Sequence, residues 1–334
     1  MPRDMNRHAV PLINAANQIR EYTRIPFPWA LLALDGNANF DLKHQGIKLC
    51  SHLINDQDVS CVDIFYDGEN LTSISAPVVF ITPGTYHVHS VINLPDTCYI
   101  FAFGAKIIMH TNAFMNSNAL TIFGGEFCDT DTDGGIFFMS PTVRLHYCQL
   151  TASTAETLIR TDSLVIENSR VDTQNIVAKP YLAMSMTDVR LVDSDFYAQK
   201  IVEFVPSPAS GNYLMVYHNR LCSRPGGESN NSKLFDIQIT SQSDGDLEID
   251  FCDNVVIFTS GTNVEYLFYI NQTSDDFDVN IGSFKSNTYH VPTDNTMNTC
   301  WVLYADTGGR FKISGIYELP IAPQGMSVNY VMIS

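Results

Sequence analysis

The sequence predicts an all-β chain folded as a right-handed parallel β-helix, a solenoid of about ten coils with a short N-terminal arm and a cap. Three observations lead to this fold class. A short apolar pattern recurs along most of the 334 residues, and its copies alternate as strands do. Charged residues make up only 16% of the chain, so that Asn, Ser and Thr supply much of the polar surface, as suits long stacked strands.

The repeat is clearest from residue 120 onward, where eight-residue copies follow one another at start-to-start spacings of about 23, 21, 25, 25, 33, 32 and 32 residues. Such spacings are typical of solenoids. The copies begin at Leu120, Val143, Leu164, Val189, Leu214 and Leu247, with looser copies near Val279 and Phe311.

The residue types at each position of one copy indicate how that copy folds. Its first and third residues are apolar, which is the period of a strand with one face toward a core. The fifth is often Asn, Gly or Asp, residues that tolerate bends, and the sixth is small. The eighth is again apolar in most copies, so the chain has turned and still faces inward. Stacking such units at about 4.8 Å buries a continuous core, and the pattern places Ile166 and Leu191 in neighbouring coils.

Two other repeat architectures fit less well. Helical solenoids need apolar residues with a 3.6-residue period, whereas the copies alternate and are rich in β-branched and aromatic residues. A propeller needs four strands in each repeat of about 40 residues, more than the first half of the repeat region allows.

The segments Pro77–Tyr86, Val91–Pro95 and Tyr99–Ile107 carry a family resemblance. A strand leads into Pro-Gly-Thr-Tyr, a short strand with Leu-Pro follows, and the next strand ends in Gly-Ala-Lys-Ile. This order resembles the start of a pectate-lyase-like β-helix, a fold shared by lyases, hydrolases, epimerases and phage tailspikes. Bacteriophage tailspikes resemble the chain best, because they place a particle-binding segment before the helix and usually trimerise. The family's Asp-Gly-rich start and Ala-Ile-rich capping helix are poorly kept in residues 34–54.

The chain divides into an arm (1–30), a cap (31–75) and the solenoid (76–334). The arm has a local charge of +2 within a chain of net charge −17, and it combines arginine with aromatic residues, both common at interfaces. We therefore expect it to act as a docking segment, and the resemblance to tailspikes implies that it docks on other virion proteins. The expected docking residues are Arg3, Arg7, Arg20, Arg24, Phe27 and Trp29. The apolar end 326–333 needs a cover, which predicts a homotrimer.

Several partners and compartments are not expected. The acidic balance would repel nucleic acid. None of the eight cysteines forms a Cys-x-x-Cys pair, so a zinc ribbon is not expected. No secretory signal and no long apolar run is recognisable, which predicts synthesis in a host cytoplasm and no membrane insertion. Together with the arm, the β-helix and the apolar C-terminal end, this predicts a place in the virion.

The segment Asp129-Thr-Asp131-Thr-Asp133-Gly134 resembles the first half of an EF-hand calcium loop, in which three carboxylates converge on the ion. The bidentate Glu of that loop is missing, because Ser140 stands at its place. A turn rich in Asp and Gly, which needs no metal, is the alternative. No other cofactor is expected.

Asp193 and Asp195, with Glu167 one coil below, are candidate acids for glycoside hydrolysis. On an extended strand the two aspartates would share one side, about 6.5 Å apart, near the separation in inverting glycosidases. We favour a different interpretation, in which Asp195 belongs to an outward ladder of salt bridges. The ladder column comprises Glu126, Gln149, Arg170, Asp195, Arg220 and Asp253.

Other chemistry has weaker support. No cluster of acids with a basic residue, as lyases require, is visible. His87 and His89 flank Val88 on one predicted face, and we interpret them as a solvated pair rather than a metal site. Four tyrosines are expected to face outward, where they can stack on sugars or subunits. They are Tyr147, Tyr197, Tyr213 and Tyr217.

Three functions follow from these patterns. The leading hypothesis is a structural or receptor-binding spike, fibre or decoration subunit of a virus particle, with host surface glycan as a partner. The alternative is a virion-borne polysaccharide depolymerase, a hydrolase or lyase on the same β-helix. A cellular carbohydrate enzyme is disfavoured, because its substrates are extracellular and no signal peptide is recognisable.

Overall fold

The computed structural model describes much of the chain from residue 62 onward. The described residues are 62–65, 71–129, 136–153, 156–183, 185–208, 211–224, 231–239, 245–258, 264–272, 277–290, 299–307, 310–313 and 328–333. The arm and most of the cap segment lie outside them. Over the described ranges the chain is all-β apart from one short 3₁₀ turn, Tyr181–Ala183.

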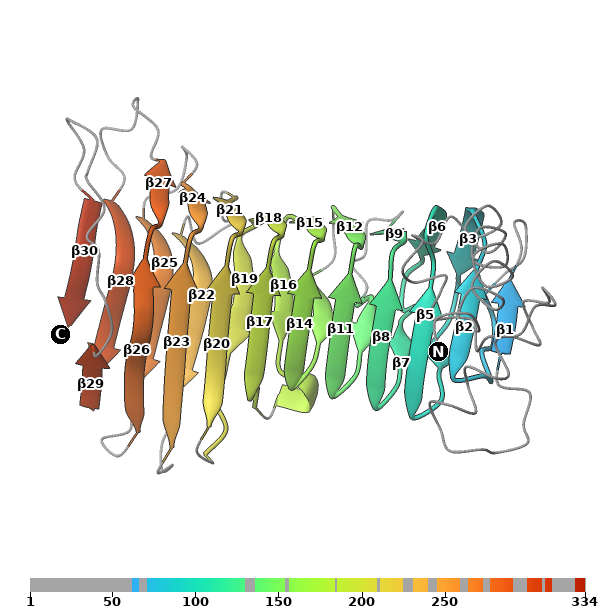
Figure 1. Ribbon diagram of the computed structural model, residues 1–334, viewed down its shortest axis with the longest axis horizontal. Coiled ribbons are helices and arrows are strands. Elements are labelled where there is room, and N and C mark those ends of the chain that lie inside the picture. The colour runs from blue at the N-terminus through green and yellow to red at the C-terminus, as the bar shows by residue number, and fades with distance from the viewer. Residues whose placement is uncertain are drawn as a thin grey trace, which may run out of the picture.

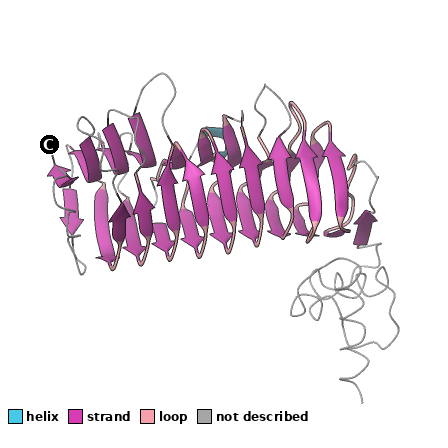
Figure 2. Ribbon diagram, turned by 90° about the horizontal axis from the view of Figure 1, so that it is seen from above, coloured by secondary structure: helices cyan, strands magenta, loops and turns pink. Residues whose placement is uncertain are grey.

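Successive coils stack along one long axis, and their corresponding strands pair to form three parallel sheets that run along it. This is the architecture of a parallel β-helix (Figures 1 and 2). We name the sheets A, B and C. Sheet A contains 11 described strands. They are β1 (Val62–Phe65), β2 (Val78–Ile81), β5 (Thr97–Phe101), β8 (Ala119–Phe123), β11 (Thr142–His146), β14 (Ser163–Glu167), β17 (Asp188–Val192), β20 (Asn212–Tyr217), β23 (Asp246–Cys252), β26 (Asp278–Lys285) and β29 (Arg310–Ile313).

Sheet B contains nine described strands and sheet C ten. Those of sheet B are β3 (Gly84–Val88), β6 (Ala105–Met109), β9 (Glu126–Asp129), β12 (Gln149–Ala152), β15 (Arg170–Thr173), β18 (Asp195–Ala198), β21 (Arg220–Ser223), β24 (Val255–Ile257) and β27 (Thr288–His290). Those of sheet C are β4 (Ile92–Asn93), β7 (Met115–Asn116), β10 (Phe138–Met139), β13 (Thr157–Arg160), β16 (Ile176–Lys179), β19 (Lys200–Phe204), β22 (Asn231–Ile239), β25 (Val264–Gln272), β28 (Thr299–Thr307) and β30 (Val328–Ile333).

The core lies between the sheets and consists of stacked apolar columns. Ile166 pairs with Leu145 on one side and Leu191 on the other, and all three are fully buried. Each column position therefore meets the same position of the next coil, as the repeat predicted. The placement of Ile166 and Leu191 in neighbouring coils is confirmed.

The bend from sheet A to sheet B is tight, with only two residues between β14 and β15 or between β17 and β18. The first bend residue has a positive φ in successive coils, for example 49° at Asn168 and 50° at Asp193. Asn, Asp and His are the non-glycine residues that tolerate this conformation best, which explains the preference for bend formers at the fifth position of the repeat.

The second bend residue is buried and joins neighbouring coils through its side chain. The amide of Ser169 donates to Ser194 Oγ at 3.0 Å, and the amide of Ser194 donates to Asn219 Oδ1 at 3.0 Å. The same contact repeats along the axis, so each buried bend amide finds an acceptor. We call this series the bend ladder. Its members are Cys148, Ser169, Ser194, Asn219, Asn254 and Asn287.

The sequence register was wrong by two residues from the copy assigned to Leu247 onward. Leu214 pairs with Ile249, not with Leu247, while Leu247, Val279 and Phe311 align with one another. The copy therefore begins at Ile249, and Asp253 becomes its first bend residue, with a φ of 58°. A bulge between β23 and β26 then accommodates one extra residue, Gly282.

The ends of the described solenoid are strands. β1 lies within the segment assigned to the cap and pairs in register with β2. β30, in the apolar C-terminal segment, is the outermost strand of sheet C. No helix in the described ranges has the length and apolar character needed to cross a membrane.

Candidate functional site

A groove of about 780 Å³ runs along the bend between sheets A and B. It spans five coils, a length of about 19 Å at the usual strand spacing. Its lining consists of the two bend residues and the first outward residue of sheet B in four of these coils, and of Asp253 and Val255 in the fifth. The lining residues are Tyr147, Cys148, Gln149, Asn168, Ser169, Arg170, Asp193, Ser194, Asp195, His218, Asn219, Arg220, Asp253 and Val255.

Local backbone geometry explains why this surface is polar and open. At the positive-φ position the side chain is directed away from the core, so Asn168, Asp193 and His218 contribute to the groove wall without disturbing the packed interior. The bend ladder beneath them is satisfied by its own hydrogen bonds. The groove can therefore present its polar groups on a rigid floor.

An aromatic wall closes the N-terminal end of the groove. Tyr147 is 46% exposed, and its ring centroid lies 6.3 Å from that of Phe103. Phe103 comes from a longer bend two coils before Tyr147 and packs over Gly124 of the coil between them, where a Cβ atom would lie only 2.5 Å from the Phe103 ring. Gly124 also has a φ of 74°, so glycine is required there for conformation and for space.

Two arginines of the groove wall, from non-adjacent coils, pack against one tyrosine of the strand between them. The guanidinium carbons of Arg170 and Arg220 lie 5.5 and 5.6 Å from the ring centroid of Tyr197, on the strand between them. Cation–π contacts of this kind hold the arginines in place. Asp195 pairs in register with both, yet among the described residues no ion pair within 4.0 Å joins it to either arginine.

The salt-bridge ladder predicted for this column is therefore wrong in its central coils. The arginines lie against Tyr197 instead, and an ion pair of the column occurs further along, where Lys106 Nζ lies 3.2 Å from Glu126 Oε1. Asp253 does not belong to the column either, because Val255 takes the place opposite Arg220.

His218 lies between two carboxylates at the C-terminal part of the groove. Its Nδ1 is 3.5 Å from Asp193 Oδ1, and its Nε2 is 3.6 Å from Asp253 Oδ2. All three side chains are about half exposed. Protonated imidazole would form ion pairs with both acids, whereas neutral imidazole offers one donor and one acceptor to a ligand.

The candidate acids are only partly brought together. Asp193 and Asp195 both line the groove, but they do not lie on one extended strand, because Asp193 is a bend residue between β17 and β18. Glu167 is at the end of β14 and does not line it. Its carboxylate lies 3.1 Å from His146 Nδ1, on the outer side of sheet A.

The thiol at the groove floor is not a reactive group. Cys148 is buried, and its Sγ lies 3.2 Å from the carbonyl oxygen of Gly124. Burial raises the pKa of this thiol to about 12, which keeps it in the protonated, unreactive form at neutral pH.

The calcium candidate is described only at its first residue. The Asp129 carboxylate accepts hydrogen bonds from the backbone amide of Ser153, at 3.0 and 3.1 Å, and lies 3.3 Å from the Ser153 hydroxyl. It thereby ties one coil to the next. Asp131 and Asp133 lie outside the described residues, as do all six docking residues of the arm, and calcium binding stays a prediction.

The groove was not predicted as a unit from the sequence. Tyr147 and Arg170 were noted separately, and His218 was not singled out. The groove could have been predicted from the fifth position of the repeat, because the bend residues at this position form a continuous column once the coils stack. That column brings together Tyr147, Asn168, Asp193, His218 and Asp253.

The arrangement suits an extended polar ligand. Carboxylate, guanidinium and imidazole groups alternate along the groove and can exchange hydrogen bonds with hydroxyl groups, while Tyr147 offers an exposed ring face for stacking. The half exposure of Asp193 and Asp253 is less suited to general acid catalysis, because a catalytic acid usually lies in an apolar pocket.

Comparisons with known proteins found no match: no family model, no curated protein and no solved structure resembles the chain significantly. The parallel β-helix is therefore supported by the three parallel sheets, and the pectate-lyase-like and tailspike resemblances rest on the sequence segments that suggested them.

Proposed function

We propose that the chain is a receptor-binding spike or fibre subunit of a bacteriophage particle, and that the groove along the bend binds a host surface glycan. In this proposal the solenoid is right-handed, has about ten coils, trimerises and faces outward. Residues 1–30 dock on other virion proteins. The observation that carries the proposal is the polar groove, which ends in exposed Tyr147 and is lined by Arg170 and Arg220, the two arginines that pack against Tyr197.

Glycan binding can be tested with an array of bacterial surface polysaccharides, followed by calorimetric titration of any polysaccharide that binds. Arg220→Ala and Tyr147→Ala should each weaken binding at least about tenfold, because each removes a large exposed contact group of the groove lining. Arg190→Ala is the matched control, since Arg190 is half exposed outside the groove and pairs with Asp188 at 3.0 Å. Equal weakening by all three variants would show that the groove is not the binding site.

The virion assignment has its own test. Mass spectrometry of purified particles should detect the chain, and deletion of residues 1–30 should abolish its incorporation while leaving the melting temperature of the body nearly unchanged. If the truncated chain fails to fold, the arm belongs to the cap and does not act as a docking segment.

Polysaccharide cleavage is the second candidate, favoured by the presence of Asp193, Asp195 and Asp253 in one groove. Incubation of the bound polysaccharide with the chain would then release new reducing ends or shorter oligosaccharides. Asp193→Asn and Asp195→Asn would abolish this release, whereas pure binding leaves the polysaccharide length unchanged.

A further inference from the structure

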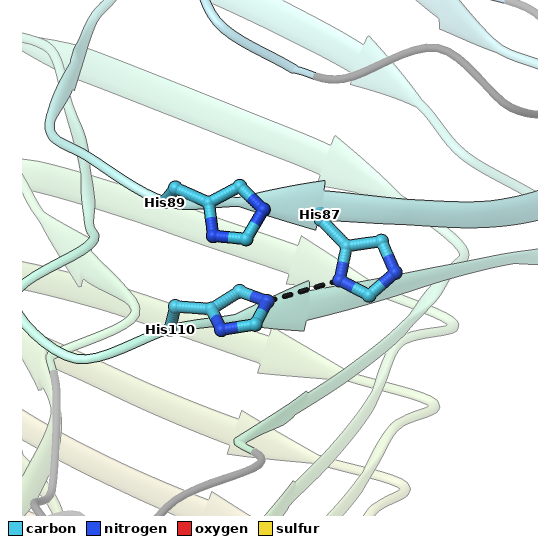
Figure 3. A group of neighbouring side chains, drawn as sticks. All are labelled: His87, His89 and His110. Atoms are coloured by element: carbon cyan, nitrogen blue, oxygen red, sulfur yellow. Dashed lines mark hydrogen bonds between the residues drawn. The ribbon is translucent and has the colours of Figure 1, made fainter.

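Three histidines gather on the outer side of sheet B, away from the groove (Figure 3). His87 belongs to β3, His89 follows the same strand directly, and His110 follows β6 in the next coil. The sequence pattern had suggested only the first two, as a solvated pair. The third histidine, His110, is more than twenty positions away in the sequence and is brought near by the stacking of the coils.

The register of the two strands explains the convergence. Along β3 the side chains of Tyr86 and Val88 are buried, so His87 and His89 point outward on the same face. Val88 pairs with Met109, and the His110 amide donates to the Val88 carbonyl at 2.9 Å. His110 therefore lies beside His89 and diagonally across from His87.

The ring nitrogens face one another. His87 Nδ1 and His110 Nε2 are 2.9 Å apart, and the ring centroids of His89 and His110 are 4.0 Å apart. One nitrogen from each of the three rings lies within 4.8 Å of the other two. Figure 3 shows the rings grouped at the ends of the two strands, with His87 and His110 joined by their hydrogen bond.

This geometry is close to that of three ligands on one metal ion. Zinc binds imidazole nitrogen at about 2.0–2.1 Å, which places the nitrogens of a tetrahedral site about 3.3 Å apart. A hydrogen-bonded pair would account for two of the rings, but not for the convergence of the third. We propose that His87, His89 and His110 form a zinc site with a fourth position open to solvent or another ligand, and that the ion clamps two neighbouring coils near the N-terminal end of the solenoid.

The proposal predicts binding and a stability effect together. The metal-stripped full chain, without a histidine tag, is titrated with zinc chloride by calorimetry. One ion should bind each chain and raise the melting temperature by a few degrees, because a ligand that binds only the folded state stabilises it. Cobalt chloride should give the visible absorption of a tetrahedral site. Binding should be lost at about pH 5, since imidazolium cannot ligate a metal.

Variants assign the site. His89→Gln and His110→Gln should each weaken zinc binding at least about tenfold and remove the zinc-dependent rise in melting temperature. His290→Gln is the control, because His290 lies at the end of a later strand of the same sheet, outside the cluster. Absence of saturable binding, or unchanged zinc affinity in His110→Gln, would overturn the site. Binding without any rise in melting temperature would overturn the clamp.

Discussion

At the residue scale, the bend ladder shows how a tight turn is kept inside a packed solenoid. Asn219 contributes three buried contacts. Its Oδ1 accepts from the Ser194 amide, and its Nδ2 donates to the Leu191 carbonyl at 2.7 Å and lies 3.2 Å from Asn254 Oδ1. A smaller apolar residue would fit the space but leave buried backbone groups unpaired.

Asn219→Ala should therefore lower the free energy of unfolding by about 2–4 kcal/mol, since two buried backbone groups lose their partners. Denaturant unfolding measures the change. Asn116→Ala is the control, because Asn116 makes an exposed contact with Asn93 at 3.3 Å, and its loss should cost less than about 0.5 kcal/mol. Similar values for the two variants would contradict a structural role of the bend ladder.

His146 ends a stack of aromatic rings on sheet A. The centroids of Phe101 and Phe123, and of Phe123 and His146, are each 5.0 Å apart. Partial burial lowers the pKa of His146 below its ordinary value of 6.5, while the neighbouring Glu167 carboxylate opposes that shift and Arg144 adds to it. In the folded state the imidazole therefore takes up a proton less readily than in the unfolded chain.

The unfolded state then binds more protons as pH falls, so the contribution of His146 to stability is present above pH 6.5 and is lost as pH falls below it. The melting temperature should decline between about pH 7 and 5. His146→Phe continues the stack without a titratable ring and should show a smaller decline, whereas His290→Phe should keep the wild-type profile. Parallel profiles for all three proteins would refute this role.

At the element scale, each strand is stabilised by identical positions of the strands beside it. Ile166 of β14 is fully buried between Leu145 of β11 and Leu191 of β17. Ile166→Ala should lower the free energy of unfolding by about 2–5 kcal/mol, because it leaves a cavity. Ile166→Asp should abolish soluble folding, while Val165→Thr, on the partly exposed face of the same strand, should be tolerated. A soluble, cooperatively melting Ile166→Asp chain would disprove the register.

Alternation predicted the strands and their inward faces correctly, but it left one register open. A shift of two residues keeps every side chain on its face, so Leu247 and Ile249 were equally good starts by pattern alone. The buried amide contacts decide between them, because only the start at Ile249 places Asn254 in the bend ladder beside Asn219. That information lies in contacts between coils, which the pattern within one copy does not contain.

The same limit applies to the sites. His87 and His89 share a face by alternation, but His110 joins them only through the pairing of β3 with β6. Arg170 and Asp195 were correctly placed in neighbouring coils, yet the pattern did not predict that Arg170 lies against Tyr197. A side chain as long as arginine can reach several neighbours, and which of them it contacts depends on residues of three adjacent strands.

At the scale of the whole molecule, the outermost described strand of sheet C bears on assembly. β30 is the outermost strand of sheet C, and such an edge offers unpaired backbone groups to another chain. We expect a homotrimer in which partner subunits cover this end. Light scattering should give three times the monomer mass of 37.3 kDa across a dilution series. Deletion of residues 326–334 should reduce the mass, and a wild-type chain that stays at 37.3 kDa would contradict the prediction.

The division of the bend into columns has a consequence for evolvability. The inward columns and the bend ladder hold the coils together, whereas Gln149, Arg170 and Arg220 are exposed residues of the groove wall. Substitutions in this exposed column leave the core untouched, so ligand preference can drift through single mutations without a matching loss of foldability. Under the proposed receptor-binding function, a lineage carrying such a scaffold can follow a changing receptor by altering a few side chains while its architecture stays the same.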